Sequence, residues 1–271
     1  MKSFRLCCEV SWPPGIRISK TPIRQIHTRS RRRNTSLVYS TKPLGMRVAE
    51  SSLEIQFLKV AQLDPGVTCV RAQPCWLSVV EHGKLRRRAP DFAVMYQGQA
   101  ELHEVKPDDE YKKPEIMSEL LAVNEEVERH PAWYYSISLE SSLFSEPLRH
   151  NTDTLWRALR PYYEIDTELL LAARELLGRK PTTGNTAIRQ LSSINNRIQA
   201  KATWDNLLSI IAASEIHFHV AERLTPDSSL WIEKSGPKRL RTLPFQKVSA
   251  ATHSNATKIP IKTFCSVELR R

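Results

Sequence analysis

The chain has 271 residues, of which 41% are hydrophobic and 25% charged, the balance of a folded protein and not of a disordered or fibrous one. No apolar run approaches the roughly 20 residues that cross a bilayer, and the first residues lack the apolar stretch of a secretory signal, so we expect an intracellular protein with no membrane partner. The five cysteines show no CxxC spacing, which argues against a disulfide framework and a zinc site.

The net charge of +11 is concentrated at the two ends of the chain. Residues 1–48 carry 11 lysines and arginines against one acidic residue and residues 236–271 carry 8 against one, whereas residues 49–150 carry 11 against 17. Basic flanks around an acidic centre are typical of a protein that binds a polyanion and holds a divalent metal. Two plainer explanations stay open: the ends serve solubility, or the Arg-rich start is an organelle transit peptide.

In chain order, residues 1–48 are expected to form a basic, mostly extended arm, because prolines and the run Arg31-Arg32-Arg33 leave no sustained helical period. The first helix is predicted at Ser51–Leu63, where apolar residues recur on one face until Asp64-Pro65-Gly66 ends the pattern. A second helix is predicted at Pro114–Arg129.

Short apolar runs separated by turn residues predict a meander of strands behind the first helix. His82-Gly83 and Gln97-Gly98 are the expected hairpin turns. The strands are expected at Val67–Ala72, Trp76–Val80, Leu85–Arg88, Phe92–Tyr96 and Ala100–Val105, with a further strand at Trp133–Leu139. Residues 49–150 therefore predict an α/β domain.

Residues 151–235 change to a mainly helical composition. Helices are expected near Glu164–Leu177, stopped by Gly178, and at Thr186–Ile194 and Lys201–Ala213, and strand-like runs at Ile216–Val220 and Leu230–Glu233. Three helices followed by a hairpin suggest a winged-helix-like C-terminal domain, and residues 236–271 form a basic tail.

The most informative motif has the form PD…ExK. Ala89-Pro90-Asp91-Phe92 is followed by His103-Glu104-Val105-Lys106, and strands pairing about Gln97-Gly98 set Asp91 opposite Glu104. Glu104 and Lys106 alternate on a strand, so their side chains emerge on the same face. An ExK triplet alone carries little information, since Glu110-Tyr111-Lys112 is a second copy, in a polar turn.

Two adjacent carboxylates repel each other unless a cation lies between them, and oxygen ligands suit Mg²⁺, for which Mn²⁺ is the expected substitute. Phosphodiester hydrolysis needs such a metal to stabilise charge on the phosphate and to lower the pKa of a bound water, while Lys106 orients that water. The alternative is a surface ion pair on an exposed hairpin.

Glu54 has two interpretations. Ser51-x-x-Glu54 is a capping box, in which the Glu side chain bonds back to the cap residue of the helix, and that role alone would explain it. The other is a further metal-binding carboxylate, for which Glu50, just before the helix, is the alternative.

These motifs together resemble a known family. The run Glu50-Ser51-Ser52-Leu53-Glu54-x-x-Phe57-Leu58, then Leu63-Asp64-Pro65, Gln73-Pro74, Pro90-Asp91-Phe92 and Glu104-Val105-Lys106-Pro107, is similar to the N-terminal catalytic domain of TnsA, the endonuclease subunit of heteromeric cut-and-paste transposases. The resemblance covers roughly residues 40–140. It implies a restriction-endonuclease-like mixed sheet flanked by helices, over residues 49–150.

The resemblance also implies roles. Glu54, Asp91 and Glu104 match the metal-binding acidic positions and Lys106 the catalytic lysine, although some TnsA proteins carry Gln where this chain has Glu104. The family cleaves the 5′ ends of a transposon in double-stranded DNA, together with a DDE-type transposase that processes the 3′ ends and an ATP-dependent regulator. The implied location is the bacterial cytoplasm.

Contacts to DNA are expected from basic residues. Arg86, Arg87 and Arg88 lie next to the predicted site, and the ends offer Arg31–Arg33, Lys238, Arg239 and Arg241, for which a solvated tail is the alternative. The third C-terminal helix carries mainly core residues, which favours a protein-partner role for that domain. Two other functions stay open: a free-standing restriction or repair nuclease, and a non-catalytic assembly factor.

Overall fold

The computed structural model describes residues 11–24, 36–38, 47–159, 164–193, 202–232 and 246–247. The basic residues Arg31–Arg33, Lys238, Arg239 and Arg241, and all of the tail except two residues, lie outside these ranges. Within them, no helix has the length and apolar character needed to cross a membrane.

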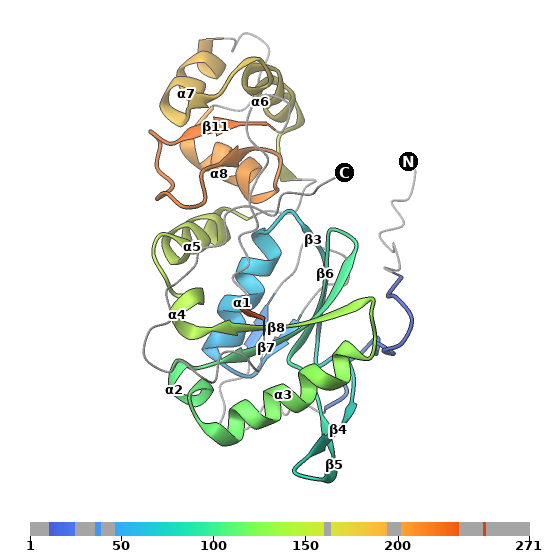
Figure 1. Ribbon diagram of the computed structural model, residues 1–271. Coiled ribbons are helices and arrows are strands. Elements are labelled where there is room, and N and C mark those ends of the chain that lie inside the picture. The colour runs from blue at the N-terminus through green and yellow to red at the C-terminus, as the bar shows by residue number, and fades with distance from the viewer. Residues whose placement is uncertain are drawn as a thin grey trace.

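A five-stranded mixed sheet forms the centre of the N-terminal half (Figure 1). Its strands lie in the order β12 (Gln246–Lys247), β8 (Trp133–Leu139), β7 (Gln99–Lys106), β6 (Phe92–Tyr96) and β3 (Val67–Ala72). β7 and β8 are parallel, and the other neighbours are antiparallel. The parallel pair requires a crossover, which α2 (Asp108–Tyr111) and α3 (Pro114–Glu128) supply.

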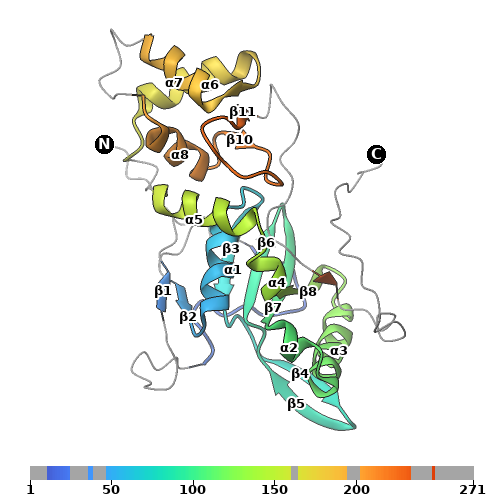
Figure 2. The same ribbon diagram turned by 90° about the vertical axis from the view of Figure 1, so that its left-hand side faces the viewer.

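Helices cover both faces of this sheet, as Figure 2 shows for α1 (Ser52–Leu63) and α3. Side chains alternate along β7, so that Leu102 packs in the core under α3 while Val105 packs in the core under α1. In the second core the rings of Phe57 and Phe92 stack with centroids 4.6 Å apart. The expected α/β architecture, a mixed sheet flanked by helices, is confirmed.

Two hairpins determine where the motif residues lie. The turn Gln97-Gly98 has φ values of 47° and 83°, and its pairs run from Tyr96–Gln99 to Phe92–His103, which is the expected register. The turn His82-Gly83, with φ values of 49° and 72°, joins β4 (Leu77–Glu81) to β5 (Lys84–Arg88). This second hairpin packs against α3 and extends beyond the main sheet (Figure 1).

The start of the described chain is not a free arm. Residues 11–24 form no helix or strand, but Trp12 stacks on Trp133 at 5.6 Å, and the Trp133 indole N–H donates to the carbonyl of Pro14 at 3.2 Å. Ile16 is buried in the core under α3. Farther along the chain, Ser36–Val38 (β1) and Arg47–Ala49 (β2) pair as a short antiparallel ladder.

A second, mainly helical unit follows the sheet. It contains α6 (Thr167–Arg179), β9 (Thr182–Thr183), α7 (Gly184–Ser193), α8 (Trp204–Ala212), β10 (His217–Phe218) and β11 (Ser229–Trp231), and its antiparallel sheet has the order β10-β11-β9. The helix was expected to stop at Gly178, and that expectation is wrong. Gly178 is helical, and α6 ends at Arg179 because Lys180 precedes Pro181 and is extended.

Helix α5 (Leu148–Ala158), preceded by the short α4 (Glu140–Leu143), was not predicted. It lies between the sheet and the C-terminal helices, in contact with α1 and α8 (Figure 1). The expected domain boundary after residue 150 falls inside this helix, which contacts both units.

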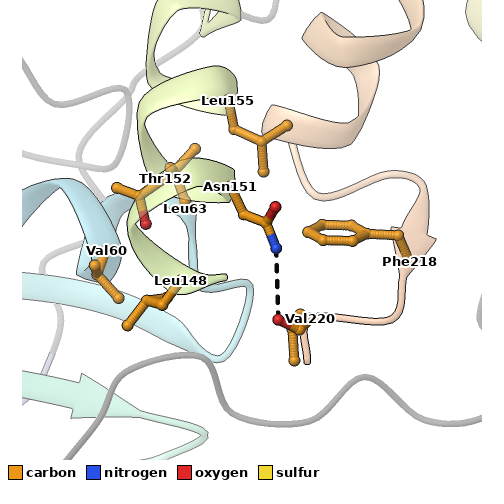
Figure 3. A pocket seen from close by; sticks show the side chains of 8 residues that line it. All are labelled: Val60, Leu63, Leu148, Asn151, Thr152, Leu155, Phe218 and Val220. Atoms are coloured by element: carbon orange, nitrogen blue, oxygen red, sulfur yellow. Dashed lines mark hydrogen bonds between the residues drawn. The ribbon is translucent and has the colours of Figure 1, made fainter. Parts of the chain in front are cut away.

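The junction is closed by polar contacts around Asn151 (Figure 3). Its amide nitrogen donates to the carbonyl of Glu222 at 2.8 Å and to that of Val220 at 3.5 Å, and its side-chain oxygen accepts from the Leu224 N–H at 2.8 Å. The apolar cavity beside it, lined by α1, α5 and β10, has a volume of about 20 Å³. That is room for about one water molecule, so this cavity is a packing defect and not a ligand site.

Candidate active site

The β6–β7 hairpin brings the PD…ExK residues together. Asp91 directly precedes β6, and continuing the register from the Phe92–His103 pair sets it opposite Glu104. One Asp91 carboxylate oxygen accepts a hydrogen bond from the Val105 N–H at 2.9 Å, which holds the side chain against the end of β7. The Lys106 ammonium donates to Glu104 with an Nζ–Oε1 distance of 2.7 Å. The expected placement of Glu104 and Lys106 on one face is therefore found.

These three side chains line a cavity of about 250 Å³. The other walls come from α3, which contributes Glu119, Leu120 and Val123, from β8, which contributes Tyr135, and from the segments around β5. The residues that complete the lining are Arg24, Arg87, Arg88, Ala89 and Pro90. Three carboxylates, an ammonium and guanidinium groups thus border one volume, unlike an ion pair on an open hairpin.

Burial perturbs both carboxylates. Burial is the main cause that raises the pKa of Glu104 to about 8, and the neighbouring Asp91 raises it further, against the opposing effect of Lys106. Burial also raises the pKa of Asp91 to about 6, while Lys106 and the Val105 N–H act in the opposite direction. The two carboxyl groups titrate as a pair, and burial disfavours the state in which both are charged.

Lys106 stays positively charged in this environment. Burial acts to lower the pKa of its ammonium, but the carboxylates of Glu104 and Asp91 outweigh burial, and the net result is a raised pKa. A lysine held in this way supplies positive charge and three N–H donors, and it is no base near neutral pH.

Glu54 is not among the residues that line the cavity. Its N–H donates to the Ser51 hydroxyl at 3.1 Å, one of its carboxylate oxygens accepts from the Glu50 N–H at 2.9 Å, and the other accepts from the Ser51 hydroxyl at 3.2 Å. This is the expected capping role, with Glu50 as the backbone partner. Burial raises the pKa of Glu54, which also acts electrostatically on Asp91, so it lies near the site without joining it.

Within the part of the chain that is described, no group of three or more His, Cys, Asp or Glu side chains is placed to hold a metal ion. Asp91 and Glu104 nevertheless fit a hard divalent cation. Mg²⁺ uses one or two carboxylates and fills its other positions with water and substrate phosphate. A cation between these two would offset the repulsion from Asp91 that, after burial, raises the pKa of Glu104. Glu54 forms capping hydrogen bonds here and lies within electrostatic reach of both carboxylates, so its role as a metal ligand stays a prediction.

The three predicted DNA-contacting arginines differ in their surroundings. Arg87 lines the cavity, with its Cζ 4.7 Å from the centre of the Trp76 ring. Arg88 forms ion pairs with Glu81 at 2.6 Å and Glu119 at 3.2 Å. Arg86 points outward, with 55% of its side chain exposed, and lies 3.4 Å from Glu81. Arg87 is the best placed of the three to meet an anion in the cavity.

Four residues near the site were not predicted: Arg24, Trp76, Glu119 and Tyr135. Arg24 arrives from the N-terminal segment, where its guanidinium donates to the Ala89 carbonyl at 3.4 Å and lies 5.7 Å from the Trp76 ring on which Arg87 also stacks. No local pattern marks Arg24 or Glu119. For Tyr135, the strand predicted at Trp133–Leu139 was the only signal, because alternation along that strand could have placed it on the sheet face that carries Glu104 and Lys106.

In comparisons with known proteins, no family model and no curated protein matches this chain.

Proposed function

We propose that this protein is a metal-dependent DNA endonuclease that cleaves the 5′ ends of a transposon as one subunit of a heteromeric transposase. The observation that carries the proposal is the convergence of Asp91, Glu104 and Lys106 on one polar cavity, with both carboxylates perturbed by burial. Clustered groups with shifted pKa values in a cavity are typical of catalytic sites.

The architecture supports this assignment. A mixed sheet with a helix on each face, and acidic residues at the start of β6 and the end of β7, is what a restriction-endonuclease-like domain requires. In the C-terminal unit the element order α6-β9-α7-α8-β10-β11, with sheet order β10-β11-β9, supports a winged-helix-like domain. Every residue of α8 from Leu207 to Ala212 is buried, and the helix packs on α5, which favours contact with protein over reading of DNA bases.

The proposed chemistry assigns each residue a task. Asp91 and Glu104 would hold Mg²⁺, or Mn²⁺ in its place, which supplies charge stabilisation on the phosphate and a water of lowered pKa. The Val105 N–H fixes the Asp91 carboxylate, so the ligand is preorganised. Lys106 orients the attacking water and stays a cation throughout. Arg87 would neutralise a backbone phosphate of double-stranded DNA.

The partners follow from the resemblance to TnsA and are part of the proposal. They are a DDE-type transposase, which would supply recognition of the transposon ends, and an ATP-dependent regulator, in the bacterial cytoplasm. The apolar α5–α8 junction gives the C-terminal unit a rigid base on which such protein contacts could be built.

The test is nicking of transposon-end DNA in Mg²⁺ by the wild type and Lys106→Ala, with and without a DDE-type transposase as the proposed partner. We expect Lys106→Ala to lose at least about a hundredfold in rate, because the Lys106 ammonium is preorganised beside both carboxylates. Lys113→Ala, an exposed lysine before α3, is the matched control and should cut as the wild type does.

The other possible outcomes distinguish the alternative functions. Equal rates for the wild type and Lys106→Ala would contradict the catalytic assignment. Specific cutting without any partner would favour a free-standing restriction or repair nuclease. A complex that forms on the ends, needs this subunit and shows no cleavage dependent on Lys106 would favour a non-catalytic assembly factor.

A further inference from the structure

The hydroxyl of Tyr135 is a polar group that lacks a partner. The side chain is 4% exposed and lines the cavity that holds Asp91, Glu104 and Lys106, yet among the described residues no atom forms a hydrogen bond with its Oη. Buried phenols almost always have a hydrogen-bond partner, because an unpaired buried hydroxyl costs its full desolvation energy. An unpaired hydroxyl at the wall of a polar cavity is therefore positioned to donate to whatever occupies the cavity, water or a bound ligand.

The fold keeps Tyr135 in this position. β8 pairs with β7 so that Tyr135 lies beside Leu102, and Ile137, two residues on, lies beside Glu104. Side chains at these positions share the face that is covered by α3, whose Leu120 and Val123 line the same cavity. The ring is thus held between the sheet and α3, at the wall of the cavity.

The charges around the cavity indicate which ligand the hydroxyl meets. Arg24 and Arg87 both border the cavity and both lie over the Trp76 ring, at 5.7 Å and 4.7 Å. In the described part of the chain neither of them forms an ion pair with a carboxylate, whereas Arg88 is paired with Glu81 and Glu119. Arg24 acts electrostatically on Asp91 but forms no close ion pair among the described residues. Two guanidinium groups that are free of such pairs and one phenolic donor suit a phosphate oxyanion, which accepts from all three.

We propose that Tyr135, Arg24 and Arg87 form a phosphate-binding subsite, in which the Tyr135 hydroxyl donates a hydrogen bond to a non-bridging oxygen of the scissile phosphodiester. The subsite rests on the proposed function, because it takes DNA as the ligand of this cavity.

Affinity measured without cleavage tests the subsite. The full-length wild type, Tyr135→Phe and Tyr134→Phe would be titrated with a short transposon-end duplex in Ca²⁺, which replaces Mg²⁺ but does not support hydrolysis by most nucleases of this chemistry. We expect Tyr135→Phe to weaken binding about tenfold, the effect of one hydrogen bond to a charged oxygen. Tyr134, on the other face of β8 and 40% exposed, is the matched control and should leave affinity unchanged.

The melting temperature separates the subsite from a purely structural role for the hydroxyl. If the hydroxyl serves only the ligand, its removal should leave the melting temperature of the free protein unchanged or higher, because the ring keeps its packing. If the hydroxyl stabilises the fold, its removal should lower the melting temperature. A duplex with one non-bridging sulfur at the scissile phosphate should bind less tightly to the wild type, and Tyr135→Phe should not distinguish it from normal DNA.

Three results would overturn the subsite: equal affinity of Tyr135→Phe and wild type, a lower melting temperature for Tyr135→Phe, or an unchanged sulfur penalty in that variant. The nuclease proposal fails separately, if the wild type binds the duplex but does not nick it in Mg²⁺ with its transposase. In that case the affinity comparison still decides whether the cavity binds phosphate through Tyr135.

Discussion

At the scale of single residues, two opposing effects act on the protonation of Glu104. Burial and the nearby Asp91 favour its neutral form, whereas the Lys106 ammonium 2.7 Å away favours its charged form. The pKa of Glu104 is raised because burial and the repulsion from Asp91 outweigh the attraction of Lys106 in the protein without metal. A divalent cation would reverse that balance, since its charge exceeds that of the lysine and it would lie between the two carboxylates.

A pH dependence of stability follows from this raised pKa. An ordinary glutamate titrates near 4.5 in the unfolded chain, and Glu104 titrates near 8 in the folded protein, so the folded state binds the proton more tightly between these values. The free energy of unfolding of the metal-free protein should therefore fall as pH rises from about 5 to about 8. The raised pKa of Lys106 adds no change in this window, because the ammonium is charged throughout.

Melting temperatures in EDTA and in Mg²⁺, measured from pH 5 to 8, would check this expectation. Glu104→Gln should flatten the decline in EDTA between about pH 6 and 8, whereas the raised pKa of Asp91 still contributes below about pH 6. Added Mg²⁺ should raise the melting temperature of the wild type more at pH 8 than at pH 5. Glu115→Gln, an exposed residue in the first turn of α3, serves as control and should melt as the wild type does. A slope that is the same in Glu104→Gln would show that other groups cause it.

At the scale of elements, the β6–β7 hairpin is the feature on which the site depends. A slip of one residue in its register would move Glu104 and Lys106 to the face covered by α1. The two-residue turn prevents that slip, because Gln97 and Gly98 both have positive φ, as such a turn requires. The face of β7 toward α1 carries a second polar contact, away from the cavity. There the buried His103 Nε2 lies 2.8 Å from Glu101 Oε2.

Gly98→Ala tests the contribution of this turn. No atom lies within 4 Å of the position a Cβ would take, so the cost comes only from the backbone at φ +83°. We expect a loss of about 1 kcal/mol in the free energy of unfolding, measured by urea denaturation. Gln99→Ala at the next, exposed position is the control, and a loss as large there would show that the turn conformation is not the cause.

At the scale of the whole molecule, α5 connects the sheet to the C-terminal unit. It contacts α1 on one side and α8 on the other, and Lys59 of α1 forms an ion pair with Asp153 at 3.3 Å. Asn151 adds the hydrogen bonds to the segment between β10 and β11. The C-terminal unit is thus attached through a buried polar contact inside an apolar junction.

Asn151→Ala should weaken this attachment. Leu224 N–H and the Glu222 carbonyl would lose their partner, and the expected cost is about 2–3 kcal/mol. Hydrogen exchange should rise in residues 217–231 and stay unchanged in β6 and β7. Asn124→Ala, a partly exposed asparagine on α3, is the comparison, and equal protection of residues 217–231 in both variants would contradict the role of Asn151.

Local patterns determined much of the fold. Strands β3, β6 and β8 begin and end where alternation and turn residues predicted, and both hairpin turns form where a residue tolerant of positive φ is followed by glycine. Helix α5 escaped prediction because Asn151, Thr152 and Asp153 are poor helix formers, and what stabilises the helix is packing between two units. Tertiary contact outweighed local propensity there.

For the site, the sequence by itself determined the hairpin, its register and therefore the meeting of Asp91, Glu104 and Lys106, because a two-residue turn relates neighbouring strands through local geometry alone. Only the tertiary structure decided that Glu54 caps its helix outside the cavity and that Arg88 is paired with acids. It also brought Arg24 from the N-terminal segment and Tyr135 from a parallel strand. Such contacts depend on how distant segments pack, and no local spacing records that.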